Sequence, residues 1–237
     1  MTLSDSSRRE SPEERLVELK RKGEHSVLVH EVYASIQGES THAGRPCVFV
    51  RTTGCHLRCA WCDTEHAFHE GKERTVDSLV DEVIALGIPL VELTGGEPLL
   101  QKSALVLVTR LLDRGLEVLI ETSGGVSIEG VDARAKLIVD VKAPGSGEDA
   151  RNVWKNLPLL VPGKDELKFV LADERDYAWA KQVLVERGVP PGVTVLFSPV
   201  WSSLAPSTLA EWIARDRLPV RFQLQLHKIL WGERSGV

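Results

Sequence analysis

The amino-acid sequence predicts an α/β fold of parallel strands covered by helices; if the strands form a (β/α) barrel, the barrel is incomplete and irregular. From residue 27 onward, β-type runs alternate with helical patterns, and such alternation implies parallel strands covered by helices. The stretches 124–136 and 143–165 are rich in glycine, proline and charged residues, so they predict poor helices. Some of the covering helices should therefore be missing or replaced.

The individual elements follow from hydrophobic spacing and from stop signals. The clearest helix is Thr75–Leu86, where apolar residues recur at helical spacing after a threonine and Gly87 follows the last turn. The other expected helices are Ser103–Arg114, Asp173–Arg187 and Ser207–Arg215. The expected strands are Val27–Ile36, Cys47–Thr52, Leu90–Thr94, Leu116–Glu121, Lys136–Lys142, Glu166–Leu171, Thr194–Ser198 and Arg221–Gln225.

The chain has 237 residues, which suffices for one domain with a sizeable core. Residues 1–25 are polar and charge-rich, and we expect an N-terminal extension there with a short helix over Glu13–Lys20. Residues 26–237 should form a single domain.

Composition excludes several classes of function. No apolar run approaches the roughly 18 residues of a membrane span, and the N-terminus lacks the apolar stretch of a signal peptide. A net charge of -5 without a long basic run argues against a nucleic-acid partner. The 4 cysteines are too few for a disulfide scaffold in a chain of this length. We therefore expect the protein to be located in the reducing cytoplasm.

Polar residues stand at the carboxyl end of one expected strand after another. In α/β barrels and open sheets, sites form at the carboxyl ends of the strands, so these residues predict one shared mouth. They are Arg51, Thr94, Glu121, Asp140 with Lys142, Ser198, and Gln225 with His227.

Three cysteines, Cys55, Cys59 and Cys62, follow directly on the strand Cys47–Thr52 at spacings of four and three residues. Thiolates grouped in one loop favour zinc or an iron–sulfur cluster over hard cations. From this loop alone, a structural zinc completed by His66 or His69 stays open. Cys47 lies within the strand itself and is expected to be a core residue.

The segment Thr94–Gln101 (TGGEPLLQ) ends one strand and opens a helix. Its two glycines let the backbone approach a ligand closely. Together with the CxxxCxxC loop, it resembles the motifs of the radical S-adenosylmethionine (SAM) superfamily. This resemblance implies a barrel of the radical SAM type, a 4Fe–4S cluster on Cys55, Cys59 and Cys62, and SAM bound at the open iron; the second match removes the zinc alternative.

The superfamily resemblance also implies which residues contact the cofactor. They lie in the cysteine loop, in the Gly-Gly-Glu segment and at later strand ends. The implied contacts are Trp61, Cys62, Asp63, Gly96, Glu97, Ser123, Val141, Lys142, Ala143, Phe197, Ser198, Pro199 and Val200.

Further segments narrow the resemblance to one family. Ile36–Ser40 (IQGES), Gly44–Pro46, Phe49–Arg51, Cys62–Thr64 and Gln225–Lys228 resemble the 7-carboxy-7-deazaguanine synthases, over about residues 27–230. That family implies conversion of 6-carboxy-5,6,7,8-tetrahydropterin to 7-carboxy-7-deazaguanine with release of ammonia, in queuosine and 7-deazapurine biosynthesis. It also implies Mg²⁺, with Thr64 as a ligand, a flavodoxin-type electron donor and a homodimer.

The substrate of that family carries a carboxylate, which an arginine binds with two parallel hydrogen bonds. Arg51 is the expected clamp, because an arginine inside an apolar strand is unlike a surface ion pair. The full implied substrate set is Ile36, Gln37, Gly38, Arg51, Thr94 and Glu121.

Two other functions compete with this assignment. A glycyl-radical-enzyme activase shares the cysteine loop and a Gly-Gly-Glu segment, but it needs neither the Gln37–Glu39 element nor a carboxylate clamp at Arg51. A non-enzymatic zinc-binding scaffold has no use for polar residues at the strand ends.

Overall fold

The computed structural model describes residues 23, 25–232, 234 and 236 and forms one nine-stranded sheet in the order β3-β1-β2-β4-β5-β6-β7-β8-β9. From β2 to β9 all neighbouring strands are parallel, whereas β1 is antiparallel to both β2 and β3. The strands are β1 (Ser26–Ile36), β2 (Pro46–Thr52), β3 (Lys72–Thr75), β4 (Leu90–Gly95), β5 (Glu117–Thr122), β6 (Lys136–Val141), β7 (Glu166–Leu171), β8 (Thr194–Pro199) and β9 (Arg221–Phe222). Because β3 and β9 are the two ends of this order and do not pair, the barrel is incomplete, as predicted.

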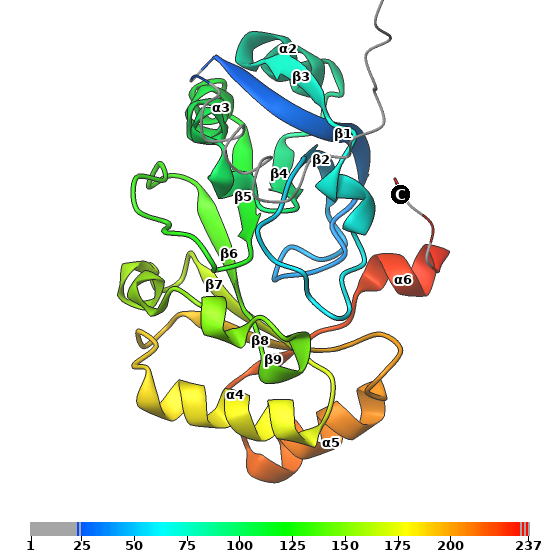
Figure 1. Cartoon of the computed structure of the whole chain (residues 1–237), viewed down its shortest axis with the longest axis vertical. Helices are drawn as coiled ribbons and strands as arrows, with labels where there is room; N and C mark the ends of the chain where they lie inside the picture. Colours follow the sequence, from blue (N-terminus) through cyan, green and yellow to red (C-terminus); the bar gives the residue numbers. More distant parts are fainter. Residues whose placement is uncertain (1–22, 24, 233, 235, 237) are drawn as a thin grey trace, which may run out of the picture.

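The α-helices lie along the sheet, with α2 and α3 beside the first strands and α4 and α5 beside the last ones (Figure 1). They are α2 (Val76–Ala85), α3 (Lys102–Asp113), α4 (Glu174–Glu186), α5 (Pro206–Asp216) and α6 (Leu226–Trp231). Thr75 caps α2 by accepting a hydrogen bond from the Ser78 N–H, and Asp173 caps α4 in the same way through the Asp176 N–H. The four helices predicted from hydrophobic spacing are all confirmed.

Two apolar clusters lie on opposite faces of the sheet. The large one joins the outer face to the buried sides of the helices, for example through Leu79 of α2 and Leu107 of α3. The small one lies on the inner face and consists of Cys47, Phe49, Leu90, Leu119 and Ile138, with Tyr33 packed against it. Cys47 is completely buried there, in keeping with its expected role as a core residue.

The stretches 124–136 and 143–165 contain no α-helix, as expected, and are held by short 3₁₀ turns and buried polar side chains instead. The turns are Pro144–Ser146, Asp149–Arg151 and Trp154–Leu159. Asn156 accepts from the Ile128 N–H at 3.1 Å, and Asp165 accepts from the N–H groups of Leu137 at 3.0 Å and Val161 at 2.8 Å. These side chains thus pair backbone N–H groups in and beside stretches that lack the hydrogen bonds of an α-helix.

Two elements differ from the prediction. The strand β3 was not expected, and of the expected strand Arg221–Gln225 only Arg221 and Phe222 pair with β8 before α6 begins. The expected helix Glu13–Lys20 lies outside the described residues, so the 1–25 extension stays a prediction. Among the helices that the structure describes, none is long and apolar enough to cross a membrane.

Candidate active site at the carboxyl ends of the strands

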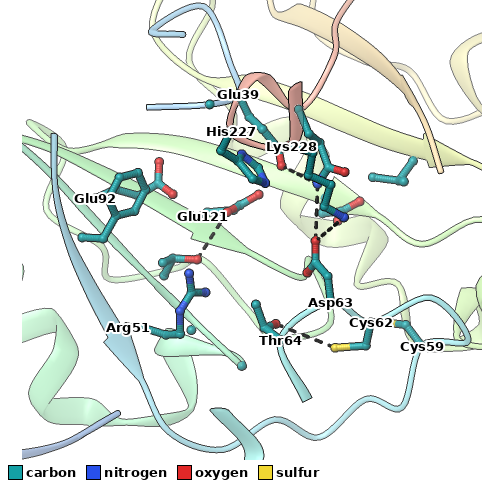
Figure 2. A pocket seen from close by; sticks show the side chains of 18 of the residues that line it. Glu39, Arg51, Cys59, Cys62, Asp63, Thr64, Glu92, Glu121, His227 and Lys228 are labelled. Atoms are coloured by element: carbon teal, nitrogen blue, oxygen red, sulfur yellow. Dashed lines mark hydrogen bonds and ion pairs between the residues drawn. The ribbon is translucent and has the colours of Figure 1, made fainter. Parts of the chain in front are cut away.

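A cavity of about 600 Å³ opens at the carboxyl ends of the strands. Its wall combines the cysteine loop, the ends of β2, β4, β5 and β6, the loop after β1 and the region of α6 (Figure 2). All three loop cysteines line it, as do all six residues of the expected substrate set and Thr64. The shared mouth predicted from polar strand ends is therefore present.

Backbone hydrogen bonds hold the cysteine loop against the Gly-Gly-Glu segment. The Glu97 N–H donates to the Gly54 carbonyl at 2.9 Å, and the Gly54 N–H donates to the Ala67 carbonyl at 2.9 Å. A Cβ atom on Gly96 would lie 2.4 Å from the Gly54 oxygen and 2.8 Å from the Cys55 Cβ. Only glycine permits this approach, so the two motifs meet at one edge of the cavity.

The three thiols are free and half-buried, and their setting suits a metal cluster. Burial raises the pKa of Cys55 to about 11 and also raises the pKa of Cys59, while the nearby Lys142 ammonium acts in the opposite direction. A bound metal must therefore displace protons from these thiols, and Lys142 stabilises the thiolates that result.

The described residues do not form a structural zinc site as they stand in this structure. Among the residues described, no three His, Cys, Asp or Glu side chains surround a common point closely enough to bind a single ion. His66, one of the two candidates for completing a zinc site, instead lies 4.0 Å from Glu31 and packs against His30. Four ligands must meet at one zinc ion, whereas each thiolate of a 4Fe–4S cluster binds a different iron and can stand apart from the others.

The carboxylate of Glu97 is buried and faces the end of β5, not the cavity. It accepts hydrogen bonds from the Thr122 hydroxyl at 2.9 Å, the Ser123 N–H at 2.7 Å and the Leu99 N–H at 3.0 Å, and also from the Ser123 hydroxyl. Glu97 therefore positions the β5 end, and its own side chain is not available to a ligand.

The expected cofactor contacts divide into two groups in the structure. One group lines the cavity and comprises Trp61, Cys62, Asp63, Gly96, Ser123, Lys142 and Val200. The other group stands behind the wall and comprises Glu97, Val141, Ala143, Phe197, Ser198 and Pro199.

The guanidinium of Arg51 lies in the cavity wall but is already paired. Its Nε donates to Glu31 Oε1 at 2.8 Å and its Nη2 donates to the Tyr33 hydroxyl at 3.1 Å. The sequence reasoning regarded an ion pair here as improbable, and the structure shows one. No described residue accepts from Nη1, which leaves that nitrogen for a ligand in the cavity.

A buried lysine joins two carboxylates at the side of the cavity. Lys168 Nζ lies 3.0 Å from Glu39 Oε2 and also contacts Glu121 Oε1. Burial alone lowers the pKa of Lys168, but Glu121 and Glu39 outweigh it and raise the pKa well above its usual range. Glu121, which also accepts from the Thr94 hydroxyl at 3.3 Å, is correspondingly ionised: Lys168 lowers its pKa despite burial.

The helix α6 forms one lip of the cavity. Lys228 Nζ lies 3.0 Å from Asp63 Oδ2, so it links α6 to the cysteine loop (Figure 2). Gln225 Nε2 donates to Glu39 Oε1 at 3.0 Å, and the Leu226 N–H donates to the Gly38 carbonyl at 2.9 Å. These contacts bring the carboxyl-terminal part of the chain over the loop that follows β1.

Among the cavity residues that the sequence did not predict are two charged ones, Glu92 and Lys168. Each lies in the middle of a strand, within the runs Leu90–Gly95 and Glu166–Leu171, and not at a strand end. The available signal was a charged residue inside an otherwise apolar run, which is costly unless the charge is paired or neutralised.

Comparison with known proteins agrees with this geometry. Residues 49–143, which span β2, the cysteine loop, β4, β5 and β6, match the model of the radical SAM superfamily. The chain is 46% identical over 206 residues to 7-carboxy-7-deazaguanine synthase of Chlorobaculum tepidum, covering 86% of this chain and 94% of that protein. It is 44% identical to the protein of the same name from Koribacter versatilis, covering 89% of this chain and all of the relative.

A solved structure shares the fold. The crystal structure of QueE from Escherichia coli superposes with a TM-score of 0.73 at 20% identity, covering 90% of this chain and 98% of that one. The fold and the cysteine loop thus define a radical SAM enzyme. Within that class, the chain belongs to the 7-carboxy-7-deazaguanine synthase family. Membership implies a 4Fe–4S cluster and SAM, and it does not favour a glycyl-radical-enzyme activase or a zinc scaffold.

Proposed function

We propose that the protein converts 6-carboxy-5,6,7,8-tetrahydropterin to 7-carboxy-7-deazaguanine and ammonia, as a step of queuosine and 7-deazapurine biosynthesis. The observation that carries the proposal is one cavity lined by the cysteine loop at one side and by Arg51, Gln37 and Glu121 at the other. The product and ammonia together contain the atoms of the substrate, so the ring contraction needs no net oxidant.

Cys55, Cys59 and Cys62 would hold the 4Fe–4S cluster, and the Gly95–Gly96 backbone together with Ser123 would face the bound SAM. When bound, the cluster and SAM supply an organic radical that removes a hydrogen atom from the substrate. Lys142, Trp61 and Val200 line the same part of the cavity and would limit water around the cofactor.

The pterin would lie between the cofactor and the loop that follows β1. Arg51, held by Glu31 and Tyr33, would direct Nη1 toward the substrate carboxylate. Gln37 and the backbone of Ile36 and Gly38 would contact the edge of the heterocycle, while Thr94 and Glu121 would contact it from β4 and β5. These side chains would hold the reacting carbon of the substrate next to the cofactor, and this positioning would raise the reaction rate.

Thr64 is proposed as a ligand of Mg²⁺. Its hydroxyl lies 3.7 Å from Cys62 Sγ and lines the cavity, so an ion there would stand between the cluster loop and the substrate. Mg²⁺ prefers oxygen ligands and keeps several waters or substrate oxygens in its shell. One hydroxyl from the protein is consistent with that preference.

Three further features are proposed from the family alone. The enzyme would receive electrons from a flavodoxin-type protein, would act as a homodimer and would work in the cytoplasm. The reducing conditions of that compartment suit three free thiols.

The test is an anaerobic incubation of cluster-loaded protein with 6-carboxytetrahydropterin, SAM, Mg²⁺ and a reductant, followed by mass analysis. We expect 7-carboxy-7-deazaguanine and ammonia in equal amounts, each dependent on SAM. SAM cleavage without any conversion of the pterin, under conditions where a known relative converts it, would contradict the proposal.

A further inference from the structure

Glu92 occupies an unusual place for an acidic residue. It lies in the middle of β4, where it pairs in register with Phe49 of β2 and precedes Leu93, and it is 3% exposed. Its inward neighbours form the small apolar cluster around Cys47, Phe49 and Leu119. The carboxyl group nevertheless reaches the cavity wall (Figure 2).

Three carboxyl groups, those of Glu39, Glu92 and Glu121, share this part of the cavity with one ammonium group. Lys168 forms ion pairs with both Glu39 and Glu121. In the described part of the chain, Glu92 has no cationic partner, and its side chain accepts only from the neutral amide of Gln37. An ionised carboxylate that is 3% exposed has little contact with solvent and here has no cation in hydrogen-bond contact, which is costly.

We propose that Glu92 is a neutral carboxylic acid in the folded enzyme. In this form its carboxyl group positions Gln37 and presents a hydrogen-bond donor to the bound heterocycle. The hydrogen bond to the heterocycle rests on the proposed function, whereas the protonation state of Glu92 does not.

The hydrogen bonds around Gln37 show how the positioning works. The Glu39 N–H donates to Gln37 Oε1 at 2.9 Å, and Gln37 Nε2 donates to Glu92 Oε2. Both ends of the Gln37 amide are thereby fixed, and its orientation is determined. The hydrogen bond from Gln37 occupies Oε2 of Glu92, and no described residue pairs with Oε1; since Glu92 lines the cavity, an acid proton on Oε1 can be donated to a carbonyl oxygen or ring nitrogen of a ligand.

The surrounding charges favour the neutral form. Burial is the largest cause that raises the pKa of Glu92, followed by the negative charges of Glu121 and Glu39; Lys168 opposes them without reversing the shift. Cys47 and Tyr33 also lie near Glu92, and burial raises the pKa of both; they therefore stay neutral, and neither can supply a compensating positive charge.

The protonation state can be measured without substrate. Infrared spectra of cluster-loaded wild type and of Glu92→Gln, both with ¹³C-labelled glutamate, should differ at neutral pH by the C=O stretch of a protonated carboxyl group. Glu117→Gln is the matched control, because Arg45 and Lys136 hold the pKa of Glu117 at about 2 and this carboxylate does not line the cavity. A Glu92 difference spectrum that contains only carboxylate bands would overturn the proposal.

Turnover tests the positioning. Glu92→Met removes both hydrogen bonds and should raise the KM for the pterin about tenfold, with a smaller change in kcat. Glu92→Gln keeps a neutral acceptor and a donor and should recover most of that loss, while uncoupled SAM cleavage and iron content stay at wild-type values in both. Equal defects in the two variants would show that a charged carboxylate is needed and would overturn the inference. If the wild type itself makes no product, the proposed function fails, and the infrared result still decides the state of Glu92.

Discussion

Arg51 shows how single residues are prepared for a ligand in this enzyme. Glu31 and Tyr33 on β1 hold two of its nitrogens, so the guanidinium plane is fixed before any substrate binds. Pre-organisation of this kind reduces the entropy lost on binding. The ion pair with Glu31 is therefore compatible with the proposed clamp role of Arg51, in which Glu31 would orient the guanidinium.

Arg51→Ala and, less severely, Arg51→Lys should lower pterin turnover by about tenfold or more, because a charge-assisted pair contributes about 1.5–3 kcal/mol and lysine lacks the planar fork. Product formation and 5′-deoxyadenosine release are measured side by side. Arg74→Lys, which alters a pair with Glu82 away from the cavity, is the control. Wild-type product rates in both Arg51 variants would remove Arg51 from the substrate site.

Thr64→Ala should weaken the dependence of turnover on Mg²⁺ while iron content stays at the wild-type value, since Thr64 lies outside the cysteine set. The measurement is activity against Mg²⁺ concentration in metal-stripped buffer. Equal activity of the wild type with and without Mg²⁺ would count against a magnesium site at Thr64.

Glu92 also predicts a dependence of stability on pH. Above the ordinary glutamate pKa of about 4.3, the unfolded chain loses the Glu92 proton before the folded enzyme does, so rising pH favours unfolding. The glutamine side chain in Glu92→Gln has no group that titrates in this pH range. The free energy of unfolding of Glu92→Gln relative to the wild type should therefore increase from pH 5.5 toward pH 8, by at most about 1.4 kcal/mol per pH unit, until Glu92 ionises in the folded state, and its relative melting temperature should rise in parallel. Anaerobic thermal unfolding at a fixed scan rate measures this, and a difference that is constant with pH would contradict it.

At the scale of elements, the packing of α6 on the loop after β1 completes the cavity. A Cβ atom on Gly38 would lie 2.2 Å from His227 Nδ1 and 3.1 Å from the His227 backbone nitrogen. Any side chain at Gly38 must therefore displace the start of α6, which also carries the contacts of Gln225 with Glu39 and of Lys228 with Asp63.

Gly38→Ala should consequently raise the KM for the pterin at least tenfold and leave iron content unchanged, because α6 meets the cysteine loop through the side chain of Asp63 and not through a cysteine. Gly23→Ala is the control, since an added Cβ there meets nothing within 4 Å. Steady-state kinetics and iron analysis of both variants test this. An unchanged KM in Gly38→Ala would show that α6 does not shape the substrate site.

The elements also show what the sequence could predict. The helix expected at Thr75–Leu86 appears as α2, because its apolar spacing and threonine cap are local signals. The strand β3 has the sequence Lys-Glu-Arg-Thr without an apolar pattern, and it exists because its backbone pairs with the edge of β1. Such pairing is a long-range effect that local spacing does not encode.

The same limit applies to the site. Residues at strand ends, such as Arg51, Thr94 and Glu121, could be found from the sequence because strand ends meet in parallel sheets. Glu92 and Lys168 carried only the signal of a charged residue inside an apolar run, which does not tell whether the side chain faces packed neighbours or a cavity. Whether an inward position meets packed side chains or a cavity depends on the whole arrangement of β1 to β9.

At the scale of the whole molecule, the open sheet brings three parts of the site together at one edge. The cysteine loop after β2, the polar ends of β4 to β6 and the α6 lip all border the same cavity (Figure 2). The proposed activity depends on a metal centre at that edge, since neither SAM cleavage nor pterin conversion can occur without it.

The most direct test is therefore metal analysis of anaerobically reconstituted protein, together with its visible absorption. We expect a brown protein with about four irons per chain, loss of the cluster when any one of Cys55, Cys59 or Cys62 is replaced by alanine, and retention of the cluster in Cys47→Ala. A colourless protein that holds one tightly bound zinc and no iron would contradict the assignment.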